Sequence, residues 1–382
     1  MNHLLPFLHG GVYYVGVFLV VLTILVFVHE LGHYLIARRN GVRIEVFSIG
    51  FGPELFGWHD RAGTRWKFSA IPLGGYVKMF GDADASSGLA APNINQLTAA
   101  ERDVSFHCKS LGQRAAIVAA GPIANFVFAI VMLAVLFMTY GQPFTPAEVG
   151  QVQPSSAAEQ GGMKAGDLIV GINGRNIERF EDVQQLVRLN PGVPMAIVVK
   201  RDGQPVSLNV TPRSTEVTDR FGDRHQIGLL GIGRNGIEYV RRDPVTAVGR
   251  AVGETWNLVA STLEAMGQII MGTRGTEELG GPLRIAQISG EVAQNGIVPV
   301  IWLMAVLSIN LGLINLFPVP VLDGGHLAFY AAEAIRGKPL GQRAQEYGFR
   351  VGLALVLTLM VFATWNDLVH IGIVDMVKRF VT

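Results

Sequence analysis

The chain has 382 residues, of which 49% are hydrophobic and only 16% are charged. Soluble domains carry about 25% charged residues, so this composition predicts a membrane protein. The formal net charge of +1 gives no electrostatic case for nucleic acid as a partner. The single cysteine, Cys108, excludes an internal disulfide and thiolate-rich zinc or iron–sulfur sites.

The first long apolar run covers residues 12–35. It is long enough to cross a bilayer, because a hydrocarbon core of about 30 Å needs about 20 residues. No Lys or Arg precedes the run and no small-residue cleavage site follows it, which predicts a retained span rather than a cleaved signal peptide. Arg38, Arg39 and Arg43 come directly after it. Since positive charge marks the cytoplasmic side, we expect this span to run from outside to inside.

The sequence HELGH, residues 29–33, lies at the cytoplasmic end of this run. Residues four apart share one face of a helix, so His29 and His33 can present two imidazole nitrogens to one cation. Glu30 is then suited to take a proton from a water molecule beside that cation. The motif also occurs by chance on soluble helices, but ionisable groups inside a span are costly and mark function. We therefore predict a zinc site with Glu30 as the general base.

Residues 38–114 are more polar than the runs on either side. Val, Ile, Phe and Tyr separated by Gly and Pro predict β-hairpins that involve residues 43–51, 64–73 and 75–81. Residues 82–103, which include DADASSG, are expected to form a mobile loop.

The second apolar run, residues 115–140, contains the sequence GPIAN. Gly121 and Pro122 indicate a kink or a close contact between helices. Asn125 is open to two interpretations. It can form a hydrogen bond that packs one helix on another, or it can lie near the metal and hold a substrate backbone or an oxyanion.

A segment of different character follows, and residues 145–212 are predicted to form a compact α+β unit. Turns are expected at Asn173–Gly174 and around Asp202–Gly203, where the chain has the Asn-Gly and Asp-Gly pairs of tight hairpins. Apolar residues at helical spacing predict a helix at 180–189. Residues 226–233 are a candidate closing strand.

Three further segments are predicted to lie in the membrane or at its surface. Residues 244–272 are amphipathic, and their charged side chains favour an interfacial helix over a span. The runs 299–317 and 351–365 are predicted to be the third and fourth spans. An even number of spans places both termini on the same side, here the outside.

Zinc in a catalytic site needs a third protein ligand besides the two histidines. The best candidate lies in NLFPVPVLDGGH, residues 315–326, just past the third span. Pro318 and Pro320 break the helix there, which lipid tolerates only where the backbone is buried in protein. Asp323 is the predicted ligand, and His326 is its rival.

Four features coincide in this chain: HELGH in the first span, GPIAN in the second, NLFPVPVLDGG at the third, and the inserted α+β unit. With these features the whole chain resembles the site-2 protease family of intramembrane zinc metalloproteases. The resemblance implies that His29, His33 and Asp323 bind Zn²⁺ and that Glu30 is the catalytic base.

The sequence IPLGGYVKM, residues 71–79, resembles the family's membrane-dipping β-loop. An edge strand there would hold an unwound substrate in an extended conformation by strand addition. The predicted substrate-binding residues are Gly74, Gly75, Tyr76, Asn125 and Asn315.

The insertion 145–233 resembles a PDZ domain, most clearly over residues 163–177. Many relatives carry two tandem PDZ units, and this chain has room for one. The resemblance implies that the enzyme makes the second cut in a single-span membrane protein of the anti-sigma factor type and releases a cytoplasmic signalling fragment. The PDZ-like unit would admit only substrates already trimmed outside. We expect a monomer whose other partner is the lipid bilayer.

The predicted fold class is an α-helical polytopic membrane protein of about four spans, with a cytoplasmic-side β-rich loop and an inserted α+β PDZ-like domain. We expect it in the bacterial inner membrane, with the PDZ-like domain and both termini periplasmic and the active site near the cytoplasmic side. The predicted segments are a first span with HELGH (1–37), a β-hairpin region (38–114), a second span (115–140), the PDZ-like domain (141–240), an interfacial helix region (241–298), a third span with LDGGH (299–326), and a fourth span with the tail (327–382).

Two other functions fit parts of the pattern. A metal-ion transporter also places His and Asp inside spans, but it needs neither a base at Glu30 nor a peptide-binding domain. A membrane-tethered PDZ adaptor with a structural metal site would need four protein ligands, and a fourth is evident only if His326 serves.

Overall fold

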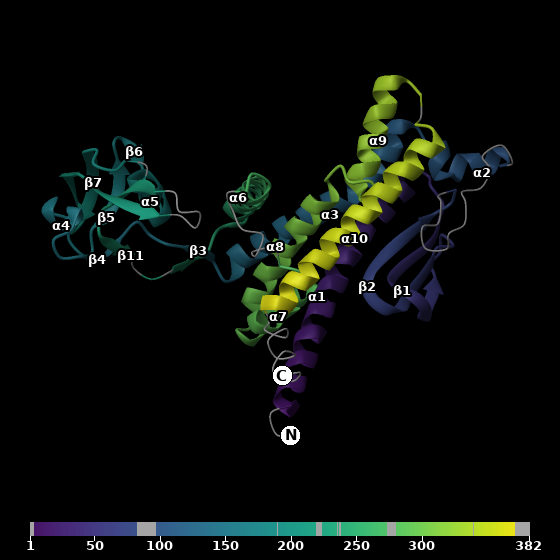
Figure 1. Cartoon of the computed structure of the whole chain (residues 1–382), viewed down its shortest axis with the longest axis horizontal. Coiled ribbons are helices and arrows are strands. Elements are labelled where there is room, and N and C mark those ends of the chain that lie inside the picture. Colours follow the sequence, from purple (N-terminus) through teal and green to yellow (C-terminus); the bar gives the residue numbers. More distant parts are fainter. Residues whose placement is uncertain are drawn as a thin grey trace. The chain divides into compact units, whose positions relative to one another are not determined.

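Figure 1 shows the fold as a computed structural model, which describes residues 4–81, 97–188, 190–218, 224–234, 236, 238–272, 280–338 and 340–370. The chain divides into two compact units, each with its own buried core. Unit 1 comprises Met1–Val135, Val248–Ile269 and Gly275–Thr382, and unit 2 comprises Leu136–Ala247 and Ile270–Arg274.

Within the described residues, four helices are long and apolar enough to cross a membrane. They are α1 (Leu4–Arg39), α3 (Leu111–Thr139), α8 (Ile297–Asn315) and α10 (Gln342–His370). Each predicted apolar run corresponds to one of these helices. The fourth is much longer than the predicted 351–365, because the helix also takes in polar turns at both of its ends.

The β-rich part of unit 1 is one bent antiparallel hairpin of two long strands, β1 (Ile44–His59) and β2 (Arg65–Met79). Ile44–Ile49 is its central segment, because it pairs with Arg65–Phe68 on one side and with Gly75–Met79 on the other. Gly75–Met79 has no second strand partner among the described residues. This segment is therefore an open edge of the sheet.

Two details of this sheet differ from the prediction. The runs 64–73 and 75–81 belong largely to the single strand β2, which bends where Gly74 adopts a φ of 141° that only glycine takes readily. The second half of β1, beyond residue 51, is also a strand. The pattern there is broken by Gly and Pro, so it was not predicted.

The hairpin turn is attached to α1 through the carboxylate of Asp60. Asp60 Oδ2 accepts hydrogen bonds from Tyr34 Oη (2.7 Å) and Trp66 Nε1 (3.2 Å), and Oδ1 accepts from the backbone N–H groups of Ala62 (2.8 Å) and Thr64 (3.0 Å). Partial burial opposes ionisation, but these four donors lower the pKa of Asp60 to about 2. The turn is thereby held against the helix that carries HELGH.

The predicted loop 82–103 is partly helical. Helix α2 covers Ala99–Val104, and Thr98 caps it: the Thr98 hydroxyl accepts from the Glu101 amide while the Glu101 carboxylate accepts from the Thr98 amide. The loop prediction is wrong for these residues. The Thr-x-x-Glu spacing was the sequence signal for the start of a helix. Residues 82–96 lie outside the described part of the chain. A short 3₁₀ helix, η2 (Phe106–Cys108), follows α2.

The third predicted segment, 299–326, is two helices rather than one. Helix α8 ends at Asn315, the chain turns through Pro318 and Pro320, and α9 begins at Asp323 and ends at Arg336. The prolines supply no backbone donor and disfavour the α conformation of the residue before them, so α8 cannot continue. A carboxylate is favourable in the first turn of a helix, which helps α9 to begin at Asp323.

The turn between α8 and α9 is packed against α10. A Cβ atom on Gly352 of α10 would overlap the carbonyl group of Pro320, and a Cβ on Gly325 would overlap the backbone at Val319 and Pro320. Val321 adopts a φ of 117°, a conformation that β-branched residues avoid. The surrounding packing therefore fixes the path of the chain into Asp323.

The predicted interfacial region 241–298 contains two helices, α6 (Pro244–Ile270) and α7 (Pro282–Gln294). Helix α7 packs against α1 and lies beside it in Figure 1. The carboxylate of Asp367 in α10 accepts hydrogen bonds from three backbone N–H groups at the start of α7. Such a carboxylate satisfies donors that a helix leaves unpaired at its N-terminus.

Unit 2 has the predicted α+β character. Its four-stranded sheet is antiparallel, with the strands in the order β6-β5-β7-β8, and three separate strand pairs are also formed: β9 with β10, β4 with β11, and β3 with β12. The elements are β3 (Gln142–Phe144), β4 (Val149–Val152), α4 (Ala157–Gln160), β5 (Leu168–Ile172), β6 (Arg175–Asn176), α5 (Phe180–Arg188), β7 (Met195–Arg201), β8 (Gln204–Val210), β9 (Arg213–Thr218), β10 (Arg224–Leu229), β11 (Ile232–Arg234) and β12 (Glu238–Val240).

The turns of unit 2 follow the sequence closely. Asn173 and Gly174 have φ values of 48° and 78°, and Asp202 and Gly203 have 51° and 83°, as a tight hairpin of this type requires. The single closing strand predicted at 226–233 is instead divided between β10 and β11, which pair with different partners.

Candidate metal centre

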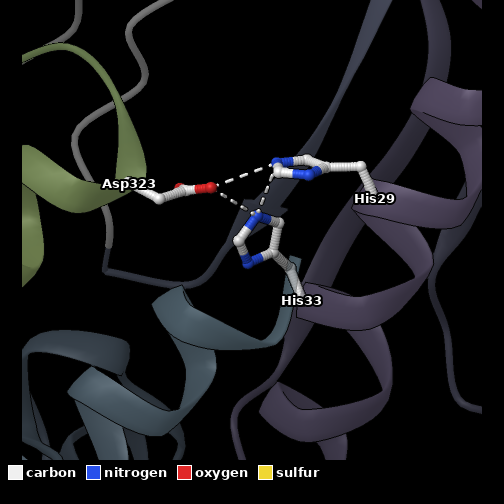
Figure 2. A group of neighbouring side chains, drawn as sticks. All are labelled: His29, His33 and Asp323. Atoms are coloured by element: carbon white, nitrogen blue, oxygen red, sulfur yellow. Dashed lines mark hydrogen bonds and ion pairs between the residues drawn. The ribbon is translucent and has the colours of Figure 1, made fainter. Parts of the chain in front are cut away.

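The HELGH sequence is helical within α1, and its two histidines point to one side, as Figure 2 shows. His29 Nε2 and His33 Nε2 are 3.2 Å apart. Close packing explains the glycine between them, because a Cβ on Gly32 would overlap the Ala120 carbonyl of α3. Helix α1 therefore approaches α3 closely at this turn and leaves both imidazoles at the helix contact.

Asp323, at the start of α9, faces the two histidines (Figure 2). Its Oδ2 lies 3.1 Å from His29 Nε2 and 3.5 Å from His33 Nε2. His33 is buried, and the side chains of His29 and Asp323 are 12% and 18% exposed. Two nitrogens and one oxygen thus converge on one point near the C-terminal end of α1.

The spacing of these three atoms fits a zinc ion. Ligand atoms that lie about 2.0–2.1 Å from a tetrahedral zinc ion are roughly 3.3 Å from one another, and the three separations here are 3.1, 3.2 and 3.5 Å. Asp323 Oδ2 is also buried without a well-formed hydrogen bond to any described residue, although both imidazoles are close to it. Three lone-pair donors in such proximity repel one another unless a metal ion or a proton lies between them.

Helix α3 supports the histidines from the other side. His33 Nδ1 donates to the carbonyl oxygen of Ile117 at 2.9 Å, and His29 Nδ1 lies 3.0 Å from Asn125 Nδ2. A Cβ on Gly121 would overlap the His33 ring and come within 2.9 Å of His29 Cε1. The rings lie against bare helix backbone at this point.

A cavity of about 900 Å³ opens onto the three residues. Glu30 lines it beside the histidines, and Tyr76 and Val77 of β2 form part of its wall. The Glu30 carboxylate has the Val77 backbone amide as a hydrogen-bond partner. The open edge of the sheet and the candidate base therefore border the same space.

The remaining predicted residues differ in whether they line or border the cavity. Asn315 lines the cavity and Gly75 lies against its wall, since a Cβ there would come 3.3 Å from Glu30 Cγ. Gly74 bends β2 but does not line the cavity, and neither does Asn125, which is fully buried. His326 lines the cavity but is not among the three residues that converge.

Sequence reasoning missed the Ile117 carbonyl and the Val77 amide, because backbone groups leave no signature in residue type. It also missed a partly buried ion pair on the cavity wall, in which Arg114 of α3 donates to Glu333 of α9 at 2.6 Å. The i, i+4, i+8 spacing of Ile117, Gly121 and Asn125 was the available signal for the α3 face.

Comparison with known proteins identifies the family. The model of peptidase family M50 matches residues 17–359. The chain belongs to peptidase family M50. A "putative zinc metalloprotease" of Agrobacterium fabrum is 49% identical over 359 residues, covering 93% of this chain and 95% of that protein. Metalloprotease MmpA of Caulobacter vibrioides is 40% identical over 376 residues, covering 92% and 94%.

This M50 peptidase is therefore a zinc metalloprotease embedded in a membrane. The transporter and adaptor alternatives are set aside by that membership. One solved structure, the PDZ domain of an SdrC-like protein from Listeria monocytogenes, is 18% identical with a TM-score of 0.19 and covers 24% of this chain and 88% of that domain. A likeness at that score leaves the PDZ resemblance of unit 2 a prediction.

Proposed function

We propose that this M50 peptidase hydrolyses a peptide bond within or near the membrane-spanning segment of a single-span protein, with zinc held by His29, His33 and Asp323. The observation that carries the proposal is the convergence of these three side chains on the wall of one cavity. Their ligand atoms are separated by the distances expected between ligands of a tetrahedral zinc ion, and the two histidines belong to an apolar helix. Zinc bound there would polarise the substrate carbonyl and lower the pKa of a water molecule to about 7.

Glu30 has the geometry of a general base in this cavity. It directly follows His29 within HELGH, lines the same space as the ligands, and has the Val77 amide as a hydrogen-bond partner. Its carboxylate would accept a proton from the attacking water and later pass it to the leaving amine. The three ligands would be occupied with the metal, so Glu30 is free for this proton transfer.

The sheet edge at Gly75–Met79 supports a mode of substrate binding. A membrane-spanning helix hides its peptide bonds, so it must be unwound before it is cut. An extended segment can add to an open edge by backbone hydrogen bonds, and this edge borders Glu30. We assign Tyr76 and Asn315 to the side-chain contacts, since both line the cavity. Gly75 keeps the edge close to Glu30.

The natural substrate is proposed to be of the anti-sigma factor type, already cut once outside and released here as a cytoplasmic fragment. Arg38 and Arg39 at the end of α1 support an active site near the cytoplasmic side of a bacterial inner membrane. Four spans would then leave unit 2 and both termini in the periplasm. Unit 2 would act as a PDZ-like filter, and the enzyme would work as a monomer.

The proposal is tested with Glu30→Gln in the full chain, reconstituted in liposomes with a single-span model substrate. Gln keeps the size of the side chain but cannot accept the proton, so cleavage should fall by about 10²- to 10⁴-fold while bound zinc stays at the wild-type level. Glu291→Gln, an exposed change on α7, is the matched control. Equal cleavage by wild type and Glu30→Gln would refute the assignment of the base.

A further inference from the structure

Residues on one face of α3 contact the rings of both His29 and His33. Ile117, Gly121 and Asn125 are spaced by four residues and therefore lie above one another on the helix. The Ile117 carbonyl meets His33 Nδ1, the Asn125 side chain meets His29 Nδ1, and Gly121 leaves room for the rings between them. Both histidines are thus held through Nδ1 and turn Nε2 toward Asp323.

The contact at His33 fixes how that ring is protonated. A carbonyl oxygen can only accept, so His33 Nδ1 carries the hydrogen. In the neutral ring Nε2 is then a bare lone pair, which is the form that binds a metal. The backbone carbonyl of Ile117 therefore holds His33 in the tautomer that can bind a metal through Nε2.

The contact at His29 needs a particular orientation of the Asn125 carboxamide. If Nδ2 donates to His29 Nδ1, the neutral ring must carry its hydrogen on Nε2, and that nitrogen cannot bind a metal. A carboxamide can turn by 180° about its last bond with little change in shape. Turned in this way, Oδ1 accepts from His29 Nδ1–H. Asn125 Oδ1 is otherwise buried with no hydrogen-bond partner among the described residues.

We propose that Asn125 is a positioning residue that holds His29 in its Nδ1–H form, with the carboxamide oxygen toward the ring when the metal is bound. The inference rests on the proposed ligand set. It replaces the expectation that Asn125 binds substrate, because the side chain is fully buried and does not line the cavity. The Ser308 hydroxyl donates to the Asn125 carbonyl at 2.9 Å, which ties this turn of α3 to α8.

Two substitutions separate the hydrogen bond from simple packing. Asn125→Asp keeps the shape and an acceptor for Nδ1–H, and Asn125→Leu keeps the approximate volume without an acceptor. Loss of an outer hydrogen-bond partner of a ligating histidine weakens metal binding by about 10- to 100-fold. Asn310→Leu is the control, because Asn310 is a polar residue in an apolar helix whose contact is with Thr262 of α6.

The measurement is zinc affinity of the full-length purified chain, obtained by competition with a chromogenic chelator, with the absorption spectrum of the Co²⁺-loaded protein as a second signal. We expect Asn125→Leu to bind zinc about 10- to 100-fold more weakly, and Asn125→Asp and Asn310→Leu to stay within a few-fold of wild type. An unchanged affinity in Asn125→Leu, or an equal loss in Asn125→Asp, would overturn the inference. Thermal unfolding of the metal-free variants identifies any that fail to fold, and for these Asn125→Ser supplies the comparison.

The same series distinguishes this inference from the proposed ligand set. If His33→Ala keeps wild-type zinc affinity, the ligand set is wrong and the role of Asn125 falls with it. If His33→Ala loses zinc while Asn125→Leu does not, only the role of Asn125 is wrong. A raised KM with unchanged zinc affinity in Asn125→Leu would restore it as a substrate contact.

Discussion

Asp323 Oδ2 lies 3.1 Å from His29 Nε2, although the two residues belong to helices near opposite ends of the chain. Replacing Asp323 by Ala would remove one of the three proposed ligands, so zinc affinity should fall by more than the about 10- to 100-fold typical of an outer partner. His326→Ala is the matched control, because His326 lines the same cavity but is exposed and outside the group of three. Zinc content after dialysis checks both, and retention in Asp323→Ala with loss in His326→Ala would reverse the assignment.

The contact between Gly352 and Pro320 predicts that α10 affects the metal site from a distance. An added methyl group at Gly352 would overlap the Pro320 carbonyl, and overpacking of this kind costs about 1–3 kcal/mol. The turn should shift and carry Asp323 with it, so Gly352→Ala should bind zinc more weakly.

Gly253→Ala on α6 is a suitable comparison, since a Cβ there meets no atom of the described residues within 4 Å. Chelator competition on both variants decides the point. Equal zinc affinity in the two proteins would mean that the turn holds Asp323 without α10.

The sheet edge makes a separate prediction about Glu30. A Cβ at Gly75 would come 2.7 Å from the Ser48 carbonyl oxygen of β1, 3.0 Å from Val26 Cγ1 and 3.3 Å from Glu30 Cγ. Gly75→Ala should therefore displace the base and lower kcat by about 10- to 100-fold, as small misplacements of catalytic groups do. Bound zinc should not change.

Gly16→Ala serves as the control on the same helix as Glu30, because the added atom has no neighbour within 4 Å in the described part of the chain. Cleavage of a model substrate is the readout. Wild-type kcat in Gly75→Ala would show that the edge and the base are not coupled.

The attachment of the hairpin turn should depend on pH. The folded pKa of Asp60 is lowered to about 2, whereas an unperturbed Asp titrates near 3.9. Asp60 therefore contributes its full stabilisation above about pH 4 and loses it as the pH falls toward 2.

Asp60→Asn should lower stability at pH 7 by about 1–3 kcal/mol, since hydrogen bonds to a charged acceptor are lost. The difference in unfolding temperature between wild type and Asp60→Asn, measured in detergent micelles, should shrink between pH 4 and pH 2. A difference that stays constant over that range would exclude Asp60 as the titrating group.

Much of the site is local and follows from the sequence. Within HELGH the four-residue spacing alone places His29 and His33 on one face, and the apolar run before them predicts the helix. The choice between Asp323 and His326 could not be made in this way, because both lie in the same turn region. It depends on where α9 begins, which is set by Pro320 and by the packing of the turn against α10.

The role of Asn125 could not be predicted from the sequence. Its type indicates a polar contact in an apolar helix, and the sequence cannot say whether that contact is with substrate, another helix or a ligand. The answer depends on the rotation of α3 about its axis, which is fixed by Gly32 and Gly121 at the contact with α1. The second half of β1 was missed for a related reason, since strand pairing across a bend compensates for weak local preference.

The separation of the ligands between α1 and α9 has a consequence for biosynthesis. Two histidines are made and inserted early, and the carboxylate that completes the group follows only after α3, unit 2 and α8 have been translated. A ribosome-bound or truncated chain that stops before α9 carries the proposed base and a sheet edge but lacks the third donor. On the proposed ligand set, the protease would gain activity only when its synthesis is almost complete.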